Sequence, residues 1–156
     1  LILFIVMKDK KLGLNMLVAT VITAVMVSLF IKGYVQRLRP YDYSVVSEYH
    51  DWFVLVNSNV QSDVYSFPSG HTSAAMAGVT AFFIWSKNKK LSWLAFIYVI
   101  LMGASRNYLM VHFPSDVMVG VLVGLISAII AHYLIEWLFK HLEDKDNPVA
   151  RYLLGK

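Results

Sequence analysis

The feature that most constrains the fold is a long run free of charged residues, Leu12 to Ile31. About 20 helical residues cross the hydrocarbon core of a bilayer, so this run has the length of a transmembrane helix. Only 15% of the chain is charged, whereas a soluble domain is about a quarter charged. We therefore expect an all-α, polytopic transmembrane helix bundle.

Further apolar segments continue this pattern along the chain. Lys8–Lys11 and Lys87–Lys90 are short charged turns between them. The apolar residues 1–7 are interpreted as the stub of a span, so the N-terminal spans are expected to be missing or truncated. The whole chain, 1–156, is predicted to form a single membrane-embedded domain. Its expected spans are 12–38, 70–87, 90–106 and 115–140, with an outer loop over 41–67.

The last span carries a stripe of small residues, which favours close packing against another helix. The stripe consists of Gly120, Gly124, Ser127, Ala128 and Ala131.

Apolar residues within 41–67, among them Tyr49, Trp52, Phe53 and Val56, recur at helical spacing. This pattern fits a helix that lies in the membrane interface. It fits a short surface helix packed on the bundle equally well.

The basic residues predict the orientation of the bundle. Alternating spans place ten of the fourteen Lys and Arg residues on one side and four on the other, namely Lys32, Arg37, Arg39 and Arg106. The side rich in basic residues is expected to be cytoplasmic. The other side then faces the periplasm or the cell exterior. This placement explains the net charge of +4 without a nucleic-acid partner.

Three polar clusters fall on the predicted outer side. In the first, Lys32 and Arg39 are seven residues apart, which nearly completes two helical turns. We expect the helix to stop at about Arg39, before Pro40, and both cations to leave one face of it. Arg37 lies off that face. Two cations on one face indicate a bound anion, although snorkelling at a helix end explains the pair as well.

The second cluster is Pro68-Ser69-Gly70-His71, before a helix expected to start near Thr72. A helix start presents unpaired N–H groups and a positive dipole end, which suit phosphate. An ordinary turn with Ser69 or Thr72 as N-cap is the alternative.

The third cluster is Ser105 to Asp116. Arg106 ends one span, and Pro114 suits the first turn of the next. Asp116 is then close enough to reach one ring nitrogen of His112, which would leave the other nitrogen as a nucleophile or base. Fixed cations, N–H donors and two histidines together form the inventory that phosphoryl transfer needs.

At this point the chain resembles the type 2 phosphatidic acid phosphatases, or lipid phosphate phosphatase superfamily. Three motifs carry the resemblance: Lys32-x6-Arg39-Pro40, Pro68-Ser69-Gly70-His71, and Ser105-Arg106-x5-His112-x3-Asp116. Membrane members usually have six spans, and this chain has four and a stub.

The resemblance implies a role for each matched residue. His112 would be the nucleophile that forms a phosphohistidine, Asp116 would orient it, and His71 would be the general acid and base. The phosphoryl oxygens would be held by Lys32, Arg39, Ser69, Gly70 and Arg106. No metal or other cofactor is expected, because the clusters hold one aspartate and no cage of carboxylates.

The expected function is hydrolysis of a lipid phosphate or diphosphate at the outer face of a bacterial-type cytoplasmic membrane. Undecaprenyl diphosphate, phosphatidylglycerol phosphate and phosphatidic acid are the substrates considered, and membrane lipids are the expected surroundings. A membrane transporter would spread charges through the spans at several depths. A non-catalytic membrane scaffold would be expected to lack at least one of His71, His112 and Asp116.

Overall fold

The computed structural model describes residues 10–43, 46–57 and 64–143. Within these residues the regular elements are helices joined by turns and loops, and one isolated antiparallel bridge links Leu38 and Tyr65. The prediction of an all-α fold is thus confirmed. The predicted stub over 1–7 lies outside the described residues.

The first described helix is continuous but changes its winding. It runs as α2 (Lys10–Val25), continues as a π-helical segment η1 (Met26–Ile31), and closes as α3 (Lys32–Val35). Gln36 then adopts a left-handed conformation with φ 50°, which ends the helix. The helix was expected to end at about Arg39, but it ends four residues earlier, at Val35.

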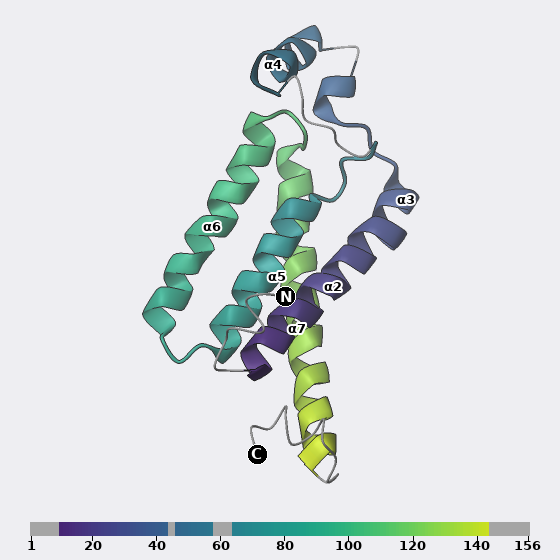
Figure 1. Cartoon of the computed structure of the whole chain (residues 1–156). Coiled ribbons are helices and arrows are strands. Elements are labelled where there is room, and N and C mark those ends of the chain that lie inside the picture. The colour runs from purple at the N-terminus through teal and green to yellow at the C-terminus, as the bar shows by residue number, and fades with distance from the viewer. Residues whose placement is uncertain (1–9, 44–45, 58–63, 144–156) are drawn as a thin grey trace.

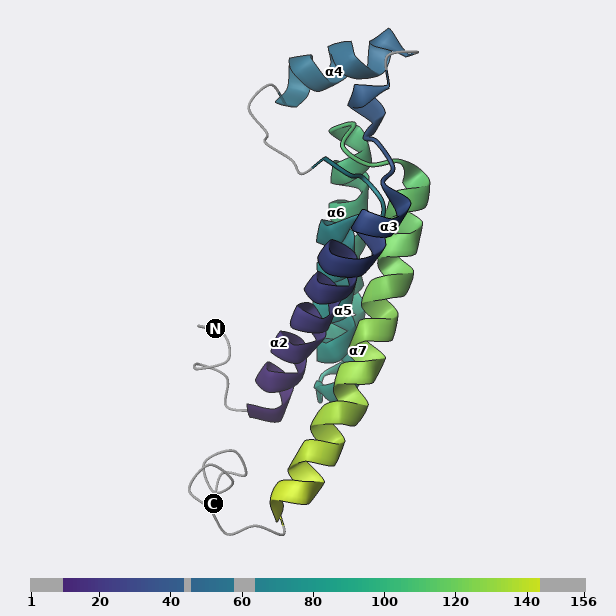
Figure 2. The same cartoon turned by 90° about the vertical axis from the view of Figure 1, so that its right-hand side faces the viewer.

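Three further long helices complete the bundle (Figures 1 and 2): α5 (Gly70–Trp85), α6 (Lys89–Tyr108) and α7 (Pro114–Glu143). Their ends lie within three residues of the segments expected to span the membrane. α5 packs against α2, α6 and α7, and is thus the central helix of the bundle.

The small residues of α7 form its contact with α5, as the sequence predicts. A Cβ added to Gly124 would lie 2.8 Å from the Cβ of Met76 and 3.0 Å from the backbone nitrogen of Ala77. A Cβ added to Gly120 would lie 2.8 Å from the carbonyl oxygen of Ser69. Since these contacts are closer than side chains tolerate, the glycines allow the two backbones to approach. This approach sets the start of α5 beside the start of α7.

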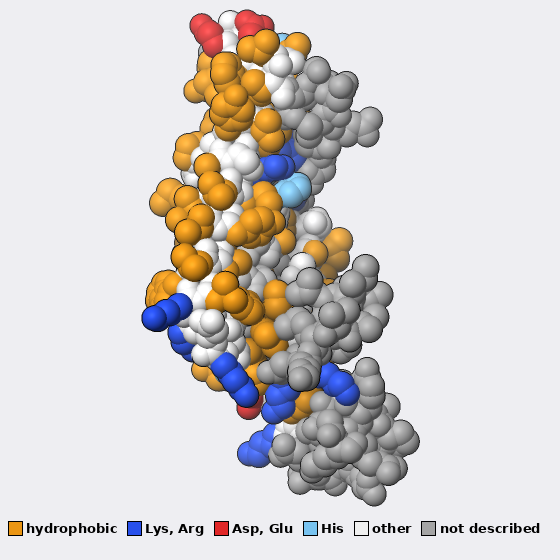
Figure 3. Space-filling view, turned by 60° about the vertical axis from the view of Figure 1, so that its left-hand side comes forward, with side chains coloured by type: hydrophobic (Ala, Val, Ile, Leu, Met, Phe, Trp, Pro, Cys, Tyr) orange, Lys and Arg blue, Asp and Glu red, His pale blue; other side chains and the backbone are white. Residues whose placement is uncertain are grey.

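Among the described residues, two helical segments are long and apolar enough to cross a membrane, Lys10–Val35 and Pro114–His141. On the face shown in Figure 3, hydrophobic side chains cover the middle of the molecule, and many Lys and Arg side chains gather toward the end opposite α4. α6 also exposes large apolar side chains, including Trp93, Leu94 and Leu101. These features indicate a membrane protein. That α5 and α6 cross the membrane as well stays a prediction.

The loop between α3 and α5 contains a short 3₁₀ turn, η2 (Pro40–Asp42), and the helix α4 (Ser47–Asn57). α4 lies across one end of the bundle (Figure 2). Its Trp52 Nε1 donates a hydrogen bond of 2.8 Å to the carbonyl of Tyr108, and Phe53 stacks on Tyr41. A helix is therefore present where the sequence predicts one, at the same end of the bundle as the polar clusters.

Candidate active site

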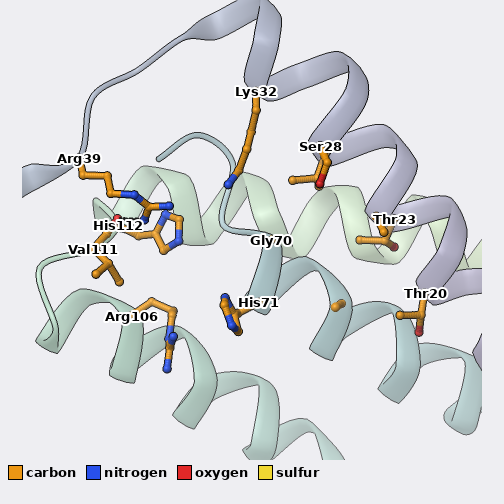
Figure 4. Close-up of a pocket in the computed structure, with 13 residues that line it drawn as sticks. Thr20, Thr23, Ser28, Lys32, Arg39, Gly70, His71, Arg106, Val111 and His112 are labelled. Carbon is orange, nitrogen blue, oxygen red and sulfur yellow. Dashed lines mark hydrogen bonds between the residues drawn. The ribbon is translucent and has the colours of Figure 1, made fainter. Parts of the chain in front are cut away.

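A cavity of about 500 Å³ opens between the α2–η1–α3 helix, the start of α5 and the α6–α7 connection. It brings together residues from all three sequence clusters (Figure 4). The predicted site residues that line it are Lys32, Arg39, Gly70, His71, Arg106 and His112. The two other predicted residues, Ser69 and Asp116, are completely buried beside it.

The first cluster reaches the cavity by a route that the sequence did not predict. Because α3 ends at Val35, Lys32 and Arg39 do not share a helical face. The prediction of a common face is therefore wrong. The left-handed Gln36 turns the chain, and Arg39 follows in extended backbone with ψ 155°. Arg39 is only 2% exposed, and its Nη1 donates to the carbonyl of Val111 at 2.7 Å. A chain reversal, and not helical periodicity, thus places both cations on the cavity wall.

The second cluster forms the first turn of α5, which begins at Gly70 and not near Thr72. Ser69 is its N-cap by position, but the Ser69 hydroxyl pairs with that of Thr72 at 3.0 Å and caps no backbone N–H. Gly70 and His71 thus occupy the start of the helix at the cavity. The first N–H groups of a helix have no partner within the helix, so this end favours an anion.

The third cluster joins the end of α6 to the start of α7. Arg106 lies in the last turn of α6, and its Nε donates to Ser105 Oγ at 3.2 Å. His112 lies in the connection and is buried, two residues before α7 begins at Pro114. Pro114 is thus in the first turn of α7, as predicted, and α7 begins one residue before the predicted span. The Ser69 N–H donates to the Asp116 carbonyl at 3.0 Å and so ties the second cluster to the third.

Asp116 is close to His112 but is not its hydrogen-bond partner. The distance from Asp116 Oδ2 to His112 Nδ1 is 3.7 Å, longer than a hydrogen bond. The carboxylate instead accepts from the backbone N–H of Phe113 at 2.9 Å, as a residue in the first turn of a helix often does. Its other oxygen accepts from Arg37 Nη1 at 2.8 Å. His112 and Asp116 are therefore adjacent, as expected, but farther apart than a hydrogen bond.

Arg37 contributes to this site although the sequence analysis assigns it no role. The predicted helical face of Lys32 and Arg39 does not include it. Its guanidinium pairs with Asp116, stacks over the Phe113 ring at 4.0 Å, and donates to Ser115 Oγ at 2.7 Å. The one available signal was its distance of two residues from Arg39.

Burial lowers the pKa of His112 below the ordinary value for histidine. The nearby Arg39 charge lowers it further, whereas the Asp116 carboxylate opposes the shift. The imidazole is therefore neutral at pH 7, and a neutral ring nitrogen carries the lone pair that a nucleophile requires. As the pH falls, this lone pair is lost at a lower pH than in an ordinary histidine.

The PAP2 superfamily model matches residues 13–140. The chain belongs to the PAP2 superfamily. This match confirms the resemblance drawn from the three motifs, and the cavity of this PAP2 chain lies where those motifs converge.

Three curated relatives resemble this PAP2 chain. The first is the bacitracin transport permease protein BcrC of Bacillus licheniformis, 35% identical over 55% of this chain and 43% of its own. Phosphatidylglycerophosphatase B of Bacillus subtilis is 34% identical over 62% of this chain and 45% of its own. An undecaprenyl-diphosphatase of Sulfolobus acidocaldarius is 29% identical over 79% of this chain and 55% of its own. The chain thus spans about half the length of these relatives. No solved structure gives a significant match.

Proposed function

We propose that this chain carries the active site of a phosphatase that hydrolyses a lipid phosphate or diphosphate. The observation that carries the proposal is the convergence of three cations and two histidines on one cavity. Lys32, Arg39 and Arg106 would hold the phosphoryl oxygens, because fixed cations stabilise the charge of the transferring group. The backbone of Ser69 and Gly70 would add the positive end of α5.

In the proposed reaction, a ring nitrogen of His112 attacks phosphorus while the bond from phosphorus to the lipid oxygen breaks. His71 gives its proton to that leaving oxygen. His71 then removes a proton from water, the hydroxide attacks the phosphohistidine, and the nitrogen–phosphorus bond breaks to release phosphate and free His112. Asp116 stabilises the charged imidazole from the other side of the ring.

The surroundings of the cavity support a lipid substrate. Its wall continues from the cations along η1 and α2 to Val27, Ala24 and Thr20. Thr20 and Thr23 already donate their hydroxyls to carbonyls in α2, which favours an apolar chain over a second phosphate there. Undecaprenyl diphosphate, phosphatidylglycerol phosphate and phosphatidic acid combine a phosphoryl group with such a chain. The names of two relatives refer to substrates of this kind.

The purified protein should release phosphate from these three lipids, and EDTA should not change the rate. The described residues contain no group of three His, Asp or Glu side chains that could hold a metal. Phosphate release would be measured in detergent micelles with and without EDTA, with glucose 6-phosphate as a control that lacks a lipid chain. Loss of activity in EDTA and its recovery with Mg²⁺ would contradict a metal-independent reaction. An absence of release from all three lipids would favour transport, the role in the name of the Bacillus licheniformis relative.

We also propose that the cavity faces the periplasm or the cell exterior. The start of α2, the α5–α6 connection and the end of α7 lie at the end of the bundle away from α4 (Figure 1). These segments carry Lys11, Lys87 and Lys140, as expected for a cytoplasmic end. The chain has no cysteine, so a single one can be introduced. In whole cells, Ser47→Cys in α4 should react with an impermeant maleimide, and Lys87→Cys should react only after the membrane is opened. The reverse pattern would overturn this orientation.

A further inference from the structure

We propose that Arg37 is a positioning residue, whose guanidinium holds the buried Asp116 carboxylate beside His112. This inference rests on the function proposed above and adds a residue from an unspecified position of the first motif, between Lys32 and Arg39. Neither Arg37 nor Asp116 lines the cavity, so Arg37 would act through Asp116 and not on the substrate.

The burial of Asp116 requires partners for its carboxylate. Its side chain has no solvent exposure, and a buried carboxylate remains charged only if partners replace water. Arg37 Nη1 supplies the positive charge at 2.8 Å from Oδ1, and the Phe113 N–H occupies Oδ2. With both oxygens held, Oδ2 is fixed 3.7 Å from His112 Nδ1. A modest movement of the ring would then bring the pair to hydrogen-bond distance when His112 becomes charged.

Arg37 is itself held by several contacts. Its guanidinium lies over the Phe113 ring at 4.0 Å, and the same Nη1 donates to Ser115 Oγ. Its carbonyl accepts from the Ser66 N–H at 2.8 Å and from the Ser66 hydroxyl at 3.2 Å. Arg37 therefore connects the end of α3, the segment before α5, and the start of α7. An arginine held at so many points is built into the site and is not a snorkelling surface cation.

Arg37 also affects the charge that His112 experiences. The ionisable groups around the ring come from every neighbouring element: Lys32, Arg39, His71, Arg106 and Asp116. Asp116 is the one anion in this set, and Arg37 neutralises it from behind. Without Arg37, the unbalanced carboxylate would favour protonated His112 and so remove the nucleophile at a higher pH.

The test is a kinetic double-mutant cycle on phosphatidic acid with Arg37→Gln, Asp116→Asn and both together. By analogy with residues that orient metal-bound histidines, we expect Arg37→Gln to lower kcat about 10- to 100-fold. KM should change little, since Arg37 does not line the cavity. The double variant should lose no more than Asp116→Asn alone, because both changes break one pair. Arg37→Lys, which retains the charge, should keep more activity than Arg37→Gln. The control Lys90→Gln, which changes an exposed cation in the first turn of α6, should resemble the wild type.

A pH profile separates positioning from mere support of the fold. The acidic limb of kcat/KM should move to higher pH in Arg37→Gln and should move back to lower pH when Asp116→Asn is added, because the unbalanced carboxylate is then gone. Three results would overturn the role of Arg37 while the wild type remained active. These are multiplicative losses of kcat in the double-mutant cycle, an acidic limb at the wild-type pH in Arg37→Gln, and a rise in KM as the main effect. A wild type inactive on all three lipids would instead overturn the proposed function, and this inference with it.

Discussion

His112→Ala is expected to abolish phosphate release from every substrate, with a loss of about 10⁴-fold or more, since removal of a nucleophile has effects of this size. A nucleophile is required whatever the leaving group is. The ring of His112 is buried at the cavity wall with a lowered pKa, so its lone pair is available at neutral pH. The loss should be equal for an alkyl phosphate and for p-nitrophenyl phosphate.

Chemical trapping provides the second measurement for His112. Rapid quenching of the wild type with labelled substrate should leave phosphate on the protein that is labile in acid and stable in alkali, as expected of a phosphohistidine. His112→Ala should carry none. The matched control is His132→Ala, a half-buried histidine of α7 that packs against Trp85 outside the cavity. An active His112→Ala protein would reject covalent catalysis by this residue, and an inactive His132→Ala protein would show that the assay reports folding.

His71→Ala is expected to be strongly impaired on an alkyl phosphate and much less impaired on p-nitrophenyl phosphate. General acid catalysis contributes about 10²–10⁴-fold where the leaving oxygen is a poor anion. An alkoxide is such an anion, whereas nitrophenolate departs without a proton. His71 lines the cavity from the first turn of α5, on a different element from His112. This position suits a residue that reaches the leaving oxygen while His112 attacks phosphorus.

The measurement that isolates this role is the burst of nitrophenol in the first turnover. Phosphorylation of His71→Ala should be near the wild-type rate with the nitrophenyl ester, followed by slow release of phosphate, because His71 must still activate water. An equal defect on both substrates at the phosphorylation step would contradict the assignment. His50→Ala, a change in exposed α4 outside the cavity, should leave both steps unchanged.

Local sequence information sufficed for much of the fold. Runs and spacings within one segment predict the positions of α5, α6 and α7. They also predict Pro114 in the first turn of the last helix and the packing role of Gly120 and Gly124. Helical periodicity and proline geometry act over a few residues, so they can be interpreted without knowledge of the neighbours. The three motifs also predicted which residues would meet, because their spacing identified the family.

Only the tertiary structure decided how these residues meet. The left-handed turn at Gln36 replaced the expected common face of Lys32 and Arg39, and it directed Arg37 toward a carboxylate 79 residues later in the chain. The partner of Asp116 is likewise set by the packing of α5 on α7 and by the bonds of Ser66 to the Arg37 carbonyl. Such contacts depend on where separate helices end in space. A pattern within one helix carries no information about them, and for that reason the sequence predicted the residues that meet at the cavity but not the ion pair of Arg37 and Asp116 beside it.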